Sequence, residues 1–132
     1  MEATRFDNTR KKLVTLKKNK EFTFLYHRGK SCSTKLMVLI YFKNRYGGMR
    51  SGFSVSKKVG KAVVRTKVRR RLKESMRALL QENTSHVHAN MIFVARTPTV
   101  QASYSQIKKD MKYLMKKAGL FETETADQGE TK

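Results

Sequence analysis

Lysine and arginine are concentrated between residues 57 and 77. Ten of these 21 residues are basic and one, Glu74, is acidic. Like charges four residues apart on a helix repel each other, and the segment contains an unbroken row of such bases: Arg65, Arg69, Lys73 and Arg77. A merely solvated helix face normally mixes charge signs, so this row predicts a polyanionic partner. Arginine suits phosphate groups and base edges because its guanidinium donates hydrogen bonds in a planar fork.

Side chains able to hydrolyse a phosphodiester bond are sparse in the chain. A protein nuclease needs clustered carboxylates that hold metal ions, or a pair of histidines. The six acids before residue 122 form no D-x-D pair, His27 stands alone, and His86 and His88 fall in a predicted loop without carboxylate neighbours. We therefore expect a loop or surface role for the histidines, no catalytic side chain and no metal site in this chain.

The overall composition points to nucleic acid. The 132 residues include 30 lysines and arginines but only 10 acids, which gives a net charge of +20. Four of the ten acids lie in the last eleven residues, so residues 1–121 hold 29 bases and 6 acids. In a chain that is 39% hydrophobic, this charge favours a folded nucleic-acid-binding domain first and an anionic membrane surface second.

Three features exclude other classes of protein. Cys32 is the only cysteine, so no internal disulfide and no disulfide-linked partner is expected, and without a paired histidine it is predicted to be a small buried residue rather than a nucleophile. The longest apolar run, residues 36–42, is too short to span a membrane. The first residues lack the apolar core of a signal peptide. The sequence therefore predicts a soluble, cytoplasmic protein.

Apolar periodicity predicts three helices. They cover residues 19–28, with Asn19 as the cap, residues 62–81, and residues 103–118, which Gly119 ends. The arc of the long helix expected to be buried is Val64, Val68, Leu72, Met76, Leu79 and Leu80, and Arg65 falls inside that arc near the helix start. In the last helix, the residues expected to face inward are Tyr104, Ile107, Met111, Leu114 and Met115, and those expected to face outward are Lys108, Lys109, Lys112, Lys116 and Lys117.

Three strands are predicted at residues 36–42, 50–56 and 90–96. The first is expected to be a central strand, because it is apolar on both faces, and Gly47-Gly48 is predicted to form a hairpin turn before the second. The order of helices and strands predicts an α+β fold with a small mixed sheet. One domain over residues 16–121 is expected, since a chain of this length has no room for two.

The two ends of the chain differ from this domain. Residues 1–18 are polar and basic, and we expect an arm that is ordered only where Leu13 and Leu16 pack down. Residues 122–132 are acidic and polar, which predicts a disordered tail.

The chain resembles a known family at its basic segment. Residues 52–70 read GFSVSKKVGKAVVRTKVRR, which is similar to the signature of the bacterial ribonuclease P protein subunit, roughly G-[LF]-S-V-S-K-K-x-G-x-A-V-x-R-N-R-x-K-R. Segments 16–17, 22–29 and 91–96 agree in the same order, so the resemblance covers about residues 16–118. Three positions depart from the family: Thr66 stands for asparagine, Lys67 for arginine, and Ile40 for an aromatic residue that Phe42 could replace.

The resemblance implies a fold and an activity. Members share an α+β fold with a left-handed βαβ crossover, also found in a ribosomal protein domain. They bind a large RNA subunit that performs catalysis, and the complex removes the 5′ leader from precursor tRNA. The protein contacts the leader in a cleft between the first helix and the sheet, and it strengthens the binding of Mg²⁺, which the RNA mainly holds.

Two RNA-binding surfaces follow for this chain. The surface expected to face the catalytic RNA consists of Lys57, Lys58, Lys61, Arg65, Lys67, Arg69, Arg70, Arg71 and Lys73. The surface expected to face the leader consists of Phe22, Tyr26 and Phe42, because an exposed aromatic ring stacks an unpaired base without reading its identity. The competing interpretation of Phe22 and Tyr26 is an ordinary buried helix pair, and Phe24, off their face, is predicted to pack.

Three rival interpretations stay open from the residues alone. A ribosomal or other structural RNA-binding protein would share the basic α+β domain. A DNA-binding protein would place the long helix in the major groove, but bases surround most of that helix and no dimerisation seam is evident. A membrane-active peptide would not need the apolar strands that specify a core. We therefore expect no DNA and no membrane partner.

Overall fold

The sheet is built around the most apolar strand of the chain. The structure, a computed structural model, describes residues 14–16, 19–45, 47–83 and 87–121. In it β5 (His88–Ala95) is the middle strand of five, in the order β1-β4-β5-β3-β2. Met91, Ile92 and Phe93 of β5 are completely buried. A strand buried on both faces reads as a continuous apolar run, so β5, rather than the predicted 36–42 segment, takes the central place.

The neighbours of β5 run in opposite directions. β3 (Met37–Asn44) pairs antiparallel with it and β4 (Met49–Ser54) pairs parallel with it. The outer strands are β2 (Lys30–Ser33), antiparallel to β3, and β1 (Val14–Thr15), parallel to β4. The α+β fold with a small mixed sheet is therefore confirmed.

The predicted hairpin at Gly47-Gly48 is wrong. Both glycines have positive φ and turn the chain, but β3 and β4, which they join, are not neighbours because β5 lies between them. The chain reaches β5 only after β4 continues through the short helix η1 (Lys57–Val59) into α3 (Ala62–Glu82). β4, α3 and β5 thus form the βαβ crossover through the basic helix.

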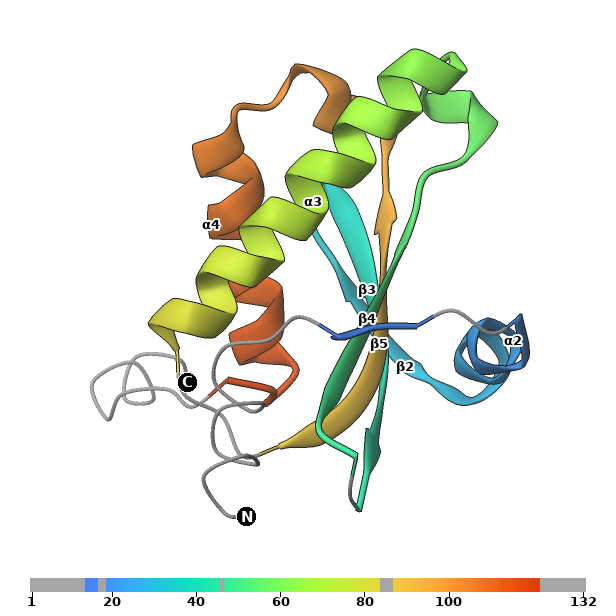
Figure 1. Cartoon of the computed structure of the whole chain (residues 1–132), viewed down its shortest axis with the longest axis vertical. Coiled ribbons are helices and arrows are strands. Elements are labelled where there is room, and N and C mark those ends of the chain that lie inside the picture. Colours follow the sequence, from blue (N-terminus) through green and yellow to red (C-terminus); the bar gives the residue numbers. More distant parts are fainter. Residues whose placement is uncertain (1–13, 17–18, 46, 84–86, 122–132) are drawn as a thin grey trace.

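Helices cover the two faces of the sheet unequally (Figure 1). α3 and α4 (Tyr104–Lys117) lie side by side on one face, and α2 (Asn19–Arg28) lies alone on the other. Phe93 points to the first face and Ile92 to the second, where Ile92 packs with Leu16 and Leu25. The sheet therefore separates a surface made by α3 and α4 from a surface made by α2.

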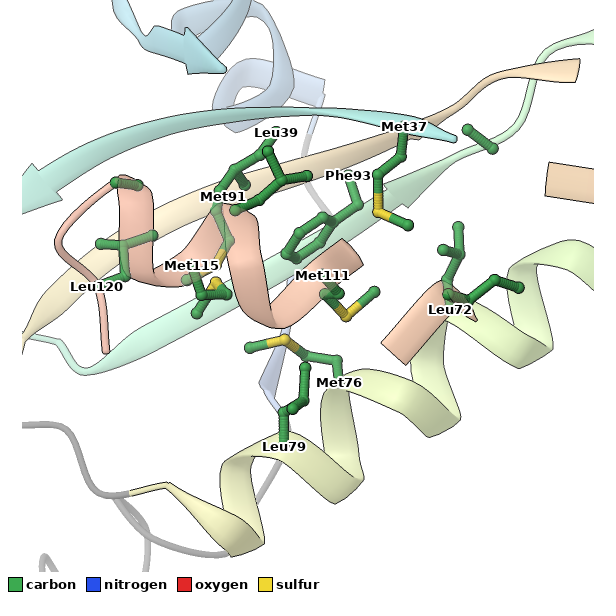
Figure 2. Close-up of a cluster of buried hydrophobic side chains, with 14 of the residues drawn as sticks. Met37, Leu39, Leu72, Met76, Leu79, Met91, Phe93, Met111, Met115 and Leu120 are labelled. Atoms are coloured by element: carbon green, nitrogen blue, oxygen red, sulfur yellow. The ribbon is translucent and has the colours of Figure 1, made fainter. Parts of the chain in front are cut away.

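The larger core is rich in methionine. Figure 2 shows Met76 of α3, Met111 of α4 and Phe93 of β5 converging between the helices and the sheet. Methionine fills irregular gaps because its side chain is unbranched and flexible. Phe93 also stacks on Phe53 of β4, with ring centroids 5.9 Å apart. This core fixes α3 and α4 on the sheet, and so determines which of their side chains face outward.

Three other expectations need correction. β2 was not predicted, because its sequence Lys-Ser-Cys-Ser has one apolar residue and no alternation. Strand β1 and the buried Leu16 lie within the predicted arm, whose residues 1–13 are outside the described residues. Tyr104, predicted to face inward, is 41% exposed because it occupies the first turn of α4, next to the cap. Ile107, Met111, Leu114 and Met115 are buried as predicted.

A capping box starts α4, and its loss gives a first prediction. The hydroxyl of Ser103 accepts a hydrogen bond from the backbone N–H of Gln106, whose side chain accepts one from the backbone N–H of Ser103. Ser103→Ala should lower the free energy of unfolding by about 1 kcal/mol, measured by urea unfolding followed by circular dichroism. Ser105→Ala, at an exposed position inside the helix, is the control and should change it by less than about 0.5 kcal/mol.

Candidate nucleic-acid interface

The basic surface of α3 is defined by what the helix buries. Val68, Leu72, Ser75, Met76, Leu79 and Leu80 form the buried stripe. This leaves Lys67, Arg70 and Arg77 exposed, with Arg69 and Lys73 half-buried at the edge of the stripe. None of these five bases is paired with a carboxylate among the described residues. The outer side of α3 therefore presents cations that no described acid neutralises.

Two arginines of the predicted set are held by backbone carbonyl groups. Arg65, which sequence periodicity places inside the apolar arc, turns back so that its Nε donates to the carbonyl oxygen of Gly60 at 3.1 Å. Nη1 of Arg71 donates to the carbonyl oxygen of Ala102 at 3.3 Å, just before α4. Arg71 thus lies on the α4 side of α3, away from Lys73 on the opposite edge. The predicted residues surround the helix rather than forming a single flat face.

The N-terminal end of α3 adds further positive charge. Lys57 and Lys58 in η1 and Lys61 at the helix start are all exposed. Lys61 occupies the N-cap position but forms no side-chain cap, and the first turn contains no acid. The backbone N–H groups of a helix start carry partial positive charge and favour anions. Phosphate groups are therefore favoured at this end as well as along the helix.

The three predicted leader-binding aromatics occupy different environments. Tyr26 on α2 is 52% exposed. Phe22 packs against the cluster of Leu16, Leu25 and Ile92, and its ring lies over Gly52, where an added Cβ would be 2.7 Å from Cε1 of Phe22. Phe22 thus matches the interpretation as a packed helix residue, whereas Tyr26 has the exposure that base stacking requires.

Phe24 is an aromatic residue that sequence reasoning assigned to packing. It is 42% exposed, and its ring meets that of Phe42 edge to face, with centroids 4.9 Å apart and planes at 87°. Phe42 is half-buried and leans on the same cluster as Phe22. The α2 side of the sheet therefore carries a Phe24–Phe42 pair and, separately, Tyr26. No spacing in the sequence distinguishes Phe24, because its exposure depends on where α2 sits on the sheet.

Comparisons with known proteins identify the family. The family model described as Ribonuclease P matches residues 11–119. The chain belongs to the ribonuclease P protein family. The ribonuclease P protein component of Clostridium botulinum strain 657 is 47% identical over 106 residues, which cover 80% of this chain and 95% of that protein. The component from Thermoanaerobacter sp. strain X514 is 43% identical over 112 residues, 85% of this chain and 95% of that protein.

Solved structures of ribonuclease P proteins have the same fold. The Staphylococcus aureus protein, 29% identical, superimposes with a TM-score of 0.72 and covers 84% of this chain and all of that chain. The Thermotoga maritima protein, 21% identical, superimposes with a TM-score of 0.69 over 78% of this chain and 96% of that chain. Since the family match spans residues 11–119, it includes both the basic helix α3 and the aromatic side of the sheet.

The titratable side chains of this ribonuclease P protein do not fit a protein-held metal ion. The described part of the chain contains no group of three histidine, cysteine or carboxylate side chains placed to hold one. Nδ1 of His88 accepts a hydrogen bond from the backbone N–H of Gly48 at 2.8 Å, so the side chain has a structural contact between β5 and the preceding turn. His27 is exposed on α2, and His86 lies outside the described residues.

Cys32 is placed as a structural residue. It is half-buried on β2, and its thiol donates to the carbonyl oxygen of Leu114 at 3.9 Å. Burial raises the pKa of the thiol, and the nearby charge of Lys117 only partly opposes this effect. A thiol is nucleophilic when it is ionised, so this environment disfavours the nucleophilic form. None of the described helices is long and apolar enough to cross a membrane.

Proposed function

We propose that this chain is the protein subunit of ribonuclease P, which binds a catalytic RNA and the 5′ leader of precursor tRNA and aids the metal-dependent removal of that leader. The observation that carries the proposal is the family match over residues 11–119. The ribosomal-protein alternative is not favoured, because the relatives and the structural neighbours are ribonuclease P proteins.

The proposed division of labour follows from the side chains present. The basic side of α3 and the lysines before it supply cations for the catalytic RNA. Phosphate contacts of this kind provide affinity and position without reading sequence. Mg²⁺ belongs to the RNA in this scheme, since the described residues offer no three-ligand group for it. The chain itself contributes no group that breaks the phosphodiester bond.

Reconstitution tests this division. The chain is purified free of RNA, combined with the catalytic RNA of the same cell and Mg²⁺, and given a precursor tRNA labelled at its 5′ end. Accurate release of the leader is expected only when the RNA is present, and faster at low Mg²⁺ with the protein than without it. Accurate cleavage by the RNA-free protein alone would show that the proposal is wrong.

Tyr26 is the residue proposed to stack a leader base. Tyr26→Ala should weaken the binding of leader-bearing precursor to the assembled complex by about 1–3 kcal/mol, while mature tRNA binds almost as before. Tyr26→Phe keeps the ring and is the matched control, which should retain most of the affinity. Dissociation constants for both tRNAs are measured with each variant, and equal losses for the two tRNAs would mean that Tyr26 does not contact the leader.

A further inference from the structure

The outward side of α4 carries an exposed aromatic ring surrounded by lysines. Tyr113 is 54% exposed. On a helix, residues three and four positions away are surface neighbours, and for Tyr113 these include Lys109, Lys116 and Lys117, with Lys112 adjacent. Lys109 and Lys117 are exposed, and Nζ of Lys117 lies 5.7 Å from the centre of the Tyr113 ring. We call Lys109, Lys112, Tyr113 and Lys117 the α4 outer face.

The stability of α4 does not require this arrangement. Ile107, Met111, Leu114 and Met115 anchor the helix on its opposite side and are completely buried. Lysines near the C-terminal end do favour a helix, but Lys112 is four residues from both Lys108 and Lys116, and such like-charge pairs are unfavourable. Lys108 is offset by an ion pair with Glu82 of α3. Asp110 is the only acid within α4.

The α4 outer face adjoins the basic surface of α3. The two helices lie side by side on the same face of the sheet, and α2 with Tyr26 lies on the other (Figure 1). Nη1 of Arg71 reaches the carbonyl oxygen of Ala102, one residue before the cap of α4. An RNA that lies along α3 can therefore extend over α4, whereas a leader held on the α2 side is separated from it by the sheet.

We infer that the α4 outer face binds a second, unpaired segment of the catalytic RNA, with Tyr113 stacking one base and Lys109 and Lys117 contacting the flanking phosphates. The inference rests on the proposed function, because it takes the catalytic RNA as the molecule bound along α3. Unpaired RNA fits better than duplex, because only a base that has left its stack can lie on an aromatic ring. Lysine suits this role, since its ammonium contacts phosphate as a point charge without fixed geometry.

Binding of the catalytic RNA to the full chain, without precursor tRNA, tests the inference. Tyr113→Ala should raise the dissociation constant about 5- to 150-fold, the loss expected for one stacked base, and Tyr113→Phe should stay close to the parent. Tyr104→Ala, an exposed tyrosine at the start of the same helix, is the matched control and should change it less than about twofold. Lys109→Gln with Lys117→Gln should lower the slope of log Kd against log salt by about 1.4–1.8.

Chemical probing of the RNA locates the contact. A short run of unpaired nucleotides should be protected by the parent protein and become reactive with Tyr113→Ala, while the nucleotides protected through α3 stay protected. Equal losses for Tyr104→Ala and Tyr113→Ala, or full binding by Tyr113→Ala, would overturn the inference. If Tyr113→Ala binds fully while neutralising Arg69 and Arg70 weakens binding, the α4 assignment fails and the proposed function stands.

Discussion

Replacing Arg69 and Arg70 together by glutamine should weaken binding of the catalytic RNA and flatten its salt dependence. Each lost phosphate contact removes about 0.7–0.9 from the slope of log Kd against log salt. The double variant should therefore lose about 1.4–1.8 in slope and roughly 30-fold in affinity at 0.1 M salt, where counterion release contributes most. Filter binding over a series of salt concentrations measures both quantities.

The matched control for this pair removes two positive charges elsewhere. Lys20 and Lys35 are exposed and lie on α2 and before β3, outside both proposed surfaces for the catalytic RNA. Lys20→Gln with Lys35→Gln should change the slope by less than half as much. Arg69 and Arg70 have no carboxylate partner among the described residues, so their loss should leave the folded state intact. An unchanged slope in the Arg69 and Arg70 variant would exclude α3 as a phosphate-binding surface.

Sequence periodicity predicted the orientation of α3 because burial there is a local property. The arc from Val68 to Leu80 repeats with the helix period, and the structure buries five of its six predicted members, with Val64 half-buried at the first turn. Once that arc is buried, the positions of the bases around the helix are fixed. Arg65 was the expected exception, and its bond to Gly60 shows how it leaves the apolar arc.

Strand order could not be predicted in the same way. The turn at Gly47-Gly48 determines that the chain reverses, but not which strand will pair with which. β5 enters between β3 and β4 because it is apolar on both faces and gains most from the central position. That choice depends on contacts between residues some forty positions apart, such as Gly52 with Ile92, and no local pattern records it. β2 was missed because an edge strand can be polar.

The aromatic side of the sheet shows the same limit at the level of single residues. Helical spacing places Phe22 and Tyr26 on similar sides of α2, yet Phe22 packs over Gly52 while Tyr26 is exposed. Gly52 begins the basic signature segment, and its missing side chain is the space that the Phe22 ring fills. This contact joins two segments that resemble the family separately, and it explains a glycine that the sequence presents only as part of a motif.

Phe93→Ala should have the largest effect on stability of any change considered. Phe93 is completely buried at the middle of the central strand, where it contacts the core under α3 and α4 and stacks on Phe53. Removing a buried phenyl ring loses its transfer free energy and leaves a cavity, which together cost about 3–5 kcal/mol. Urea unfolding followed by circular dichroism measures the loss.

Phe24→Ala is the comparison that separates burial from residue type. It removes the same atoms from a position on α2 that is 42% exposed, and it loses mainly the edge contact with Phe42, for an expected cost of about 1 kcal/mol. Because Phe93 holds the helices rather than touching RNA, its variant should bind the catalytic RNA normally at temperatures where it is folded and lose binding as it unfolds. A folded Phe93→Ala protein with weakened binding would instead mean that the core sets the spacing of α3 and α4 on the RNA, and equal stability losses in the two variants would contradict the assigned core.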